Sequence, residues 1–506
     1  MTLVIKGAHI VTGDGADTRY DKGDIVVEAD RITALGADAG AAAATGGAEI
    51  IDGAALIAMP GFVNAHIHSS EAFQQAVYKN APLEPWLLEA HSPFGSRLPT
   101  AREHYLTSML SGILAIRGGA TTVQDDFIHI AATPDAQDHS IQAYYDLGIR
   151  AWSAVDMWDV PFSETLPYVE ELFPPELKAD FDALPIADAE HWLNLFQAHF
   201  DKWHERDGLI RVHIAPCGPQ RVTPELWREI DKLSAKHHIP LHSHCLETRL
   251  QAIESRWRHG KSFVEYLSDL DMLSDRLTLV HAIWVTERDI SLIAEAGVSI
   301  IHNSLSNLKT GAGVCPLRKY FDADVAVGLG TDGVCTADGA DMVEAIKATA
   351  LMHTLGTLDY PNWIDAKDAF RLATTGGAAT GLMSEQVGSL EIGKKADIIL
   401  LDRNDWGFIP FSDPVHHLAY SVNSEVIRHS IINGKVVMRD RKMTTIDEAE
   451  IHAEIRETAE KFLHEEVPAM RKGAAPYQPY MREMYLKAYN TPLDLPHYPR
   501  FPDVDS

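Results

Sequence analysis

The strongest constraint on the fold is a repeated pattern of short apolar runs between residues 58 and 335. Runs of this length predict strands that are buried on both faces. Longer segments with helical periodicity, such as 223–237 and 286–296, separate them. This alternation predicts βαβ units and a parallel sheet. The predicted strands are 58–68, 120–126, 150–157, 210–217, 239–247, 277–281, 298–303 and 325–332.

Eight such units predict an α/β fold with a closed (β/α)8 TIM barrel over residues 58–383. The carboxyl ends of barrel strands meet on one face, where reactive residues gather. Four of the predicted strands end in imidazole or carboxylate side chains. The chain therefore assembles one site from distant segments.

Residues on both flanks of the barrel show short strand patterns with glycine-rich turns. We expect residues 1–57 and 384–445 to form one small composite β-sandwich domain, with strands over 3–11, 23–27, 387–393, 396–401 and 426–437. Residues 446–506 are expected to form an acidic helix over 446–471 and then an extended tail.

Composition narrows the class of protein. Of 506 residues, 46% are apolar and 23% are charged, which is typical of a soluble globular chain. A net charge of -28 without a basic stripe argues against nucleic-acid and membrane partners. The N-terminus has no leader pattern, and no apolar run is long enough to span a membrane, so we expect a cytoplasmic protein. Four widely separated cysteines argue against a disulfide framework or a thiolate zinc site.

The first predicted barrel strand ends in His66-Ile67-His68. Residues two apart in a strand point to one face, so both imidazoles enter the barrel, about 7 Å apart. His244 and Asp332 end two later strands and complete a set of nitrogen and oxygen ligands. Such a set leaves a place for water, which loses a proton near neutral pH. We expect one divalent metal per chain, Zn²⁺ or Fe²⁺.

Three residues are candidates for the catalytic steps. Glu247, three residues past His244, is expected to carry a proton from the water to the departing nitrogen. His281 could be a further ligand, but we favour a role in polarising the substrate. Asp332 can accept the water proton while bound to metal. His242 is expected to be a buried supporting residue.

These motifs resemble the amidohydrolase superfamily and, within it, the triazine hydrolase/cytosine deaminase-like branch. The resemblance covers about residues 1–445. It rests on Pro60-Gly61-Phe62-Val63-Asn64-Ala65-His66-Ile67-His68, His244-x-x-Glu247, Val280-His281-Ala282, His302-Asn303-Ser304-Leu305-Ser306-Asn307-Leu308, Gly330-Thr331-Asp332-Gly333 and Gly388-x-Leu390-x-x-Gly393-Lys394-x-Ala396-Asp397. It implies that His66, His68, His244 and Asp332 hold one divalent metal, and that Glu247 and His281 assist hydrolysis. The fourth predicted strand has no lysine that could bridge a second metal.

The substrate is less constrained. Cys217 follows Pro216, as in hydroxytriazine and oxopurine hydrolases of this branch, and Glu71 stands where a glutamine is common. Both are candidate substrate contacts, although Glu71 could equally be a solvated loop carboxylate. We expect deamination of a small nitrogen heterocycle of the triazine, oxopurine or pterin type, by a homo-oligomer. Alternatives are hydrolysis of an acyclic urea, carbamate or amide, dechlorination of a chlorotriazine, or a barrel that serves only as a scaffold.

Overall fold

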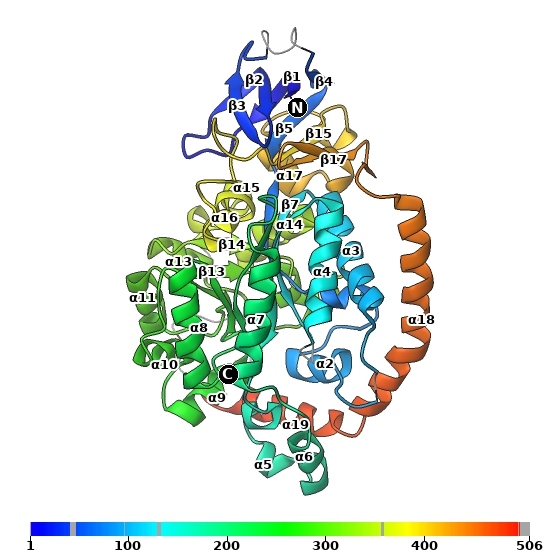
Figure 1. The fold of residues 1–506 in the computed structure, drawn as a ribbon. Helices are drawn as coiled ribbons and strands as arrows, with labels where there is room; N and C mark the ends of the chain where they lie inside the picture. The colour runs from blue at the N-terminus through cyan, green and yellow to red at the C-terminus, as the bar shows by residue number, and fades with distance from the viewer. Residues whose placement is uncertain are drawn as a thin grey trace.

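The computed structural model describes residues 2–40, 47–95, 97–128, 133–355, 359–493 and 495. Figure 1 shows a sheet near the N-terminus at one end of the molecule and parallel strands surrounded by helices in the middle. The helices α5 (Val169–Leu172), α6 (Pro175–Asp182) and α19 (Gln478–Asn490) lie at the opposite end. The long helix α18 (Glu448–Ala474) runs along the side.

The central strands form two parallel sheets in chain order. One contains β6 (Phe62–Ile67), β7 (Ala120–Phe127), β8 (Arg150–Met157), β9 (Ile210–Val212) and β10 (Ala215–Pro216). The other contains β11 (Leu241–Cys245), β12 (Leu277–His281), β13 (Ser299–His302) and β14 (Val327–Leu329). A parallel bridge between Ile214 and Leu241 links the two sheets. On the other side, the amide of Asp332 donates to the backbone oxygen of His66 at 2.9 Å.

Helices follow the strands, and their starts are encoded locally. The main ones are α3 (Ala101–Arg117), α4 (Pro134–Leu147), α7 (Ala189–Trp203), α8 (Pro224–His237), α9 (Arg249–His259), α10 (Phe263–Asp269), α11 (Glu287–Ala296), α13 (Leu317–Asp322) and α14 (Met342–Met352). Thr286 and Asp289 form a capping box at α11, and the Thr223 side chain caps α8. Both helices match segments with predicted helical periodicity. The result is an α/β fold of parallel strands alternating with helices.

The flanking sheet combines both ends of the chain. Its nine strands are β1 (Thr2–Val11), β2 (Arg19–Glu28), β3 (Arg31–Gly36), β4 (Glu49–Asp52), β5 (Leu56–Pro60), β15 (Ile398–Asp402), β16 (Ile427–Ile432), β17 (Lys435–Arg439) and β18 (Lys442–Met443). β5 lies between β1 and β15, where it pairs parallel to β1 and antiparallel to β15. Apolar side chains from both ends, including Ile5, Ile25, Leu400 and Ile431, pack into one cluster.

Four predicted strands are divided or absent in the structure. The run 210–217 forms two short strands, β9 and β10, and the run 426–437 forms the antiparallel pair β16 and β17. The run 58–68 is not one strand, because β5 ends at Pro60 and β6 starts at Phe62. A Cβ on the intervening Gly61 would lie 2.1 Å from Cγ2 of Thr121, so only glycine fits where the chain passes between sheets. The predicted strand 387–393 consists of turns, and the chain re-enters the sheet at β15.

A buried ion pair joins the flanking sheet to the central strands. Arg150, the first residue of β8, donates to both carboxylate oxygens of Asp397 at 2.9 and 3.0 Å. The amide of Asn433 also donates to Asp397, at 2.8 Å. Both charged side chains are almost fully buried. The Ala396-Asp397 step of the motif thus fixes the sheet against the end of β8.

The C-terminal region is more helical than the sequence suggested. α18 matches the helix predicted over 446–471 and packs against η1 (Ser69–Gln74), α2 (Leu83–Ala90) and α3. The prediction of an extended tail is wrong over α19. Its buried residues Met481, Met484 and Ala488 recur at helical spacing, and the helix packs against α2, α5 and α9. The predicted extension of 496–506 lies outside the described residues.

Shorter elements complete the described chain: η2 (Phe162–Thr165), α12 (Ser304–Lys309), η3 (His353–Leu355), η4 (Tyr360–Asn362), α15 (Ala366–Arg371), the π-helical turn η5 (Leu372–Gly376), α16 (Gly377–Thr380), η6 (Trp406–Phe408), α17 (Pro414–Tyr420) and η7 (Ser424–Val426). Within the described ranges, none of the helices has both the length and the apolar character that crossing a membrane requires.

Candidate metal centre and catalytic cavity

Three predicted histidine ligands come together at the carboxyl ends of β6 and β11. Each ring uses Nδ1 for a hydrogen bond with a neighbour: His66 with Nε2 of His242 at 2.8 Å, His68 with the backbone oxygen of Asp126 at 2.6 Å, and His244 with the backbone oxygen of Cys217 at 3.0 Å. The Nε2 atoms are thereby left as the potential ligand atoms. Fixing one ring nitrogen through an outer neighbour is how proteins orient metal-binding histidines.

Asp332 faces these rings from the segment after β14. Its Oδ1 lies 3.4 Å from Nε2 of His66 and 3.3 Å from Nε2 of His68. The buried residue adopts φ +71°, a left-handed conformation that non-glycine residues rarely take. The next position must be glycine, because a Cβ on Gly333 would lie 1.9 Å from Oε2 of Glu71. Local backbone geometry therefore presents this carboxylate to the histidines.

The donor set fits a divalent metal ion. Ligand atoms of His66, His68 and Asp332 lie within 4.8 Å of one another, as do those of His66, His244 and His281. Nε2 of His66 is buried and has no hydrogen-bond partner among the described residues. Imidazole nitrogen with carboxylate oxygen suits Zn²⁺ and similar ions. Ligand atoms also lie this close together in two further sets of side chains: His66, Asp126 and His242, and Asp126, Asp156 and His244.

Burial and neighbouring charges shift the pKa values of these side chains. Burial lowers the pKa of His68, but the charges of Asp332 and Glu71 outweigh burial, so the net shift of this pKa is upward. Burial lowers the pKa of His66 to about 4, with the charge of His68 adding to the effect. It also lowers the pKa of His244 well below the ordinary value. Neutral imidazole is the form that binds metals, so the rings of His66 and His244 are ready to bind near neutral pH.

Glu247 and His281 lie together beside Asp332. Nε2 of His281 is 3.7 Å from Oε2 of Glu247 and 3.5 Å from Oδ2 of Asp332. On its other side, Nδ1 of His281 hydrogen-bonds to Oδ1 of Asn307 at 2.8 Å. The amide oxygen is an acceptor, so Nδ1 carries the proton and Nε2 faces the site. Burial raises the pKa of Glu247 well above its ordinary value, and Asp332 adds to this. Glu247 thus takes up a proton more readily than an exposed carboxylate.

A cavity of about 110 Å³, here called the catalytic cavity, opens over this cluster. His68, His244, Glu247, His281 and Asp332 line it. The two long loops after β6 and β8 also contribute to the lining, with Glu84 and Thr165 and with six apolar side chains: Leu83, Trp86, Leu87, Phe162, Leu166 and Pro167. The cavity thus combines a cluster of polar side chains with several large apolar ones, a lining typical of sites for small molecules.

Both predicted substrate contacts line the catalytic cavity, but each is engaged by a neighbour. Oε1 of Glu71 hydrogen-bonds to Nε2 of His91 at 2.7 Å, and Oε2 accepts from the Cys335 thiol at 3.0 Å. The Cys217 thiol hydrogen-bonds to the carboxylate of Asp156. The buried position of Glu71 excludes the solvated loop carboxylate considered from the sequence.

Several residues near the site were not predicted from the sequence. Asn307 lies in a quoted motif, but only the folded chain places it behind His281. Asp126 and Asp156 lie at the carboxyl ends of β7 and β8, and both are buried. Their position at strand ends is the same signal that identified the histidines, and it could have identified them too.

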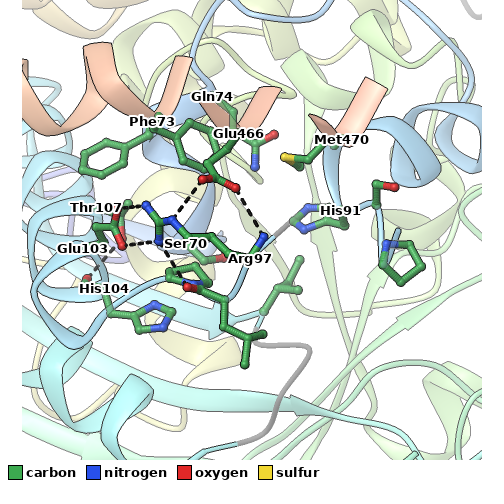
Figure 2. Close-up of a pocket in the computed structure, with 17 residues that line it drawn as sticks. Ser70, Phe73, Gln74, His91, Arg97, Glu103, His104, Thr107, Glu466 and Met470 are labelled. Carbon is green, nitrogen blue, oxygen red and sulfur yellow. Dashed lines mark hydrogen bonds and ion pairs between the residues drawn. The ribbon is translucent and has the colours of Figure 1, made fainter. Parts of the chain in front are cut away.

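A second cavity, of about 160 Å³, lies between the residue 69–100 loop, α3 and α18 (Figure 2). In it Arg97 forms ion pairs with Glu103 at 2.6 Å and Glu466 at 2.9 Å. His91 lines this cavity while hydrogen-bonding to Glu71 of the catalytic cavity. The guanidinium charge is already neutralised here, so we assign chemistry to the catalytic cavity.

Comparison with known proteins identifies the family of this chain. The model of the amidohydrolase family matches residues 57–437. A 5-methylthioadenosine/S-adenosylhomocysteine deaminase from Thermococcus kodakarensis is 30% identical over 438 residues, which cover 87% of this chain and 94% of the relative. A 5'-deoxyadenosine deaminase from Methanobrevibacter smithii is 28% identical, with 91% and 98% covered. The crystal structure of the zinc complex of atrazine chlorohydrolase from Arthrobacter aurescens TC1 superposes with a TM-score of 0.81 at 26% identity, covering 90% of this chain and all of that one.

The fold and the histidine cluster define a hydrolase of the α/β class with a site for a divalent metal. The chain belongs to the amidohydrolase family, as its motifs predicted.

Proposed function

We propose that this protein is a metal-dependent hydrolase that deaminates a nitrogen heterocycle. The observation that carries the proposal is a cluster of three Nδ1-anchored histidines, two of which, His66 and His68, face Asp332, next to a cavity that Glu247 also lines. A scaffold protein would need neither the free Nε2 atoms nor a buried proton carrier. The family and the deaminase names of its relatives support the same reaction class.

In this proposal His66, His68, His244 and Asp332 hold one divalent ion, with Zn²⁺ the first choice. Zinc is bound in the similar chlorohydrolase structure, and the donor set suits it. Such an ion supplies a nucleophile near neutral pH, because it lowers the pKa of a water that it binds. The two sets of side chains that include Asp126 hold no metal ion in this proposal.

The protein's own side chains then accept and donate the protons of the reaction. Glu247 accepts a proton from the attacking water and delivers it to the departing nitrogen. Water adds to the ring carbon, the C–N bond breaks, ammonia leaves, and a hydroxyl group replaces the amine. The remaining hydroxyl proton moves to the neighbouring ring nitrogen, which leaves an oxo group on the carbon. Nε2 of His281, held in place through Asn307, faces the polarised substrate atom. The apolar side chains of the lining, including Trp86 and Phe162, exclude water and orient the ring.

The substrate is proposed to be of the triazine, oxopurine, pterin or related aminopurine type. The relatives' names point to adenosine-like substrates, whereas Cys217 after Pro216 favours oxopurine or hydroxytriazine chemistry. Dechlorination of a chlorotriazine is the second candidate, and the chlorohydrolase similarity favours it. Cleavage of acyclic ureas, carbamates or amides would use the same side chains.

We also propose that the nine central strands, of which β9 and β10 together occupy the fourth predicted strand, close into one (β/α)8 barrel. We propose in addition that residues 1–57 with 384–445 form a second domain, and that the chain is a cytoplasmic homo-oligomer. The Ile214–Leu241 bridge and the bond from Asp332 to His66 support closure. The apolar cluster shared by both chain ends supports the domain.

The test of function measures three products in parallel. Enzyme depleted of metal and then reloaded with zinc is incubated with aminopurines, aminopterins, aminotriazines, chlorotriazines and aryl ureas. We expect zinc-dependent ammonia release from at least one aminoheterocycle. Release of chloride or an alkyl or aryl amine alone would favour the alternatives, and turnover that survives metal depletion would contradict the metal requirement.

A further inference from the structure

One wall of the catalytic cavity presents buried polar atoms that no neighbour satisfies. Oδ1 of Asp156, Oε1 of Gln220 and Nε of Arg221 are each buried and have no hydrogen-bond partner among the described residues. All three residues line the catalytic cavity. Buried polar groups are nearly always paired, so unpaired ones facing a cavity indicate groups that a ligand satisfies.

Asp156 is held firmly in this position. It is the next-to-last residue of β8, is 4% exposed, and its carboxylate hydrogen-bonds to the Cys217 thiol. The backbone around it is paired, since the amide of Cys217 donates to the carbonyl of Met157 at 2.9 Å. The side chain therefore offers one fixed, free acceptor oxygen.

Arg221 is the complementary donor. Its backbone carbonyl accepts from the amides of Asp159 and Val160 at 3.1 Å, which fixes the loop after β10 to the segment after β8. Its guanidinium lies 5.3 Å from the ring centroids of both Trp158 and Phe162. Arg221 and Asp156 form no ion pair with each other in the described structure, although both face the same cavity. Each group remains available to a substrate.

We propose that Asp156 and Arg221 select the substrate: a heterocycle that carries, besides the amino group removed, a second N–H donor for Asp156 and a ring-nitrogen or oxo acceptor for Arg221. This proposal rests on the proposed deamination. It gives Glu71 no role in specificity, because His91 and Cys335 already hydrogen-bond to the two carboxylate oxygens of Glu71. Because Glu71, Asp156, Glu247 and Asp332 all line the cavity, a carboxylate or phosphate substituent on the substrate is disfavoured.

The test uses probe pairs that differ by one amino group: 2,6-diaminopurine with adenine, and 2,4-diaminopteridine with 4-aminopteridine. Affinities are measured at pH 8 by titration calorimetry on the zinc-loaded Glu247→Gln variant, while ammonia release is measured on the zinc-loaded wild-type chain. We expect the diamino member of at least one pair to bind about 10- to 100-fold more tightly, because it makes one more hydrogen bond, to the otherwise unpaired oxygen of Asp156.

Variants separate recognition from a structural role. Asp156→Leu, which matches the shape without an acceptor, should abolish the preference for the diamino probe, and Asp156→Asn should keep part of it. Arg221→Met should weaken both members of a pair equally, because the ring nitrogen is common to both. Glu71→Gln is the matched control, another buried cavity carboxylate whose change should leave the ratio unaltered. Melting temperatures report whether each variant folds.

The outcomes distinguish the two proposals. A preference that is unchanged in Asp156→Leu, or no measurable binding of any diamino probe, overturns the specificity assignment. Ammonia release without dependence on Asp156 leaves deamination standing and refutes this inference. Binding that depends on Asp156 without any ammonia release supports the inference and refutes deamination.

Discussion

Replacing Glu247 with glutamine tests the proposed proton transfer. The side chain is 3% exposed, and its Oε2 lies 3.7 Å from Nε2 of His281. Glutamine keeps the size and the hydrogen-bonding capacity but cannot accept a proton. Loss of general acid–base transfer reduces turnover by about 10²- to 10⁴-fold, which raises the barrier by about 3 to 5 kcal/mol. We therefore expect kcat for ammonia release to fall by this factor.

Metal binding and stability should respond differently from turnover. Glu247 belongs to none of the four groupings of potential metal ligands, so metal content should remain at the wild-type level. Burial raises the pKa of this carboxyl, so removing its charge should preserve or raise the melting temperature. The assay combines steady-state ammonia release, elemental analysis and thermal unfolding on the same preparation. Near-wild-type turnover would refute the proton-transfer role, and loss of metal would identify Glu247 as a ligand instead.

Three further predictions concern the metal, pH and the domain contact. His244→Ala should lose bound metal and activity together. His213→Leu should keep both, because it changes a buried histidine whose ring nitrogens have no hydrogen-bond partner among the described residues; equal metal content of the two variants by elemental analysis would contradict the ligand assignment. Burial raises the pKa of Glu254 from an ordinary 4.5 to about 8. Between pH 4.5 and pH 8 the native state therefore binds one proton more than the unfolded state, and the free energy of unfolding falls as the pH rises through this range. Glu254→Gln should flatten this fall in urea unfolding at pH 5 to 9, and parallel curves would refute the argument. Asp397→Ala should lower the free energy of unfolding by about 3 to 5 kcal/mol, because it leaves Arg150 buried and without its carboxylate partner. The double variant Arg150→Met with Asp397→Leu should regain most of this stability. An equal loss in the single and the double variant would show that the ion pair is not the cause.

Much of the fold could be predicted because buried parallel strands leave continuous apolar runs between amphipathic helices. The apolar runs did not predict the strands correctly where the result depends on which strands pair, because a run of apolar residues does not identify its pairing partner. Nothing in the apolar character of 58–68 shows that β5 pairs with β15 and that β6 belongs to another sheet. The helix α19 was missed because its prolines and tyrosines suggested extension, whereas packing against α9 stabilises it.

The candidate site was predictable where side chains end strands and unpredictable where they meet across the fold. His66, His68, His244 and Asp332 were predicted as ligands by their position. In the structure, ligand atoms of His66 lie within 4.8 Å of those of His68 and Asp332 in one grouping, and of those of His244 and His281 in another. Contacts between distant residues carry no sequence signal. The pairing of Glu71 with His91 and Cys335, which occupies a predicted substrate contact, becomes visible only in the folded chain.

Anomalous X-ray diffraction at the zinc edge, on crystals of the zinc-loaded protein, tests the central claim most directly. The account predicts one strong peak per chain, about 2.0 to 2.2 Å from Nε2 of His66, His68 and His244 and from an oxygen of Asp332. A peak between Asp126 and Asp156 in place of this one, or no peak in crystals of active protein, would contradict it.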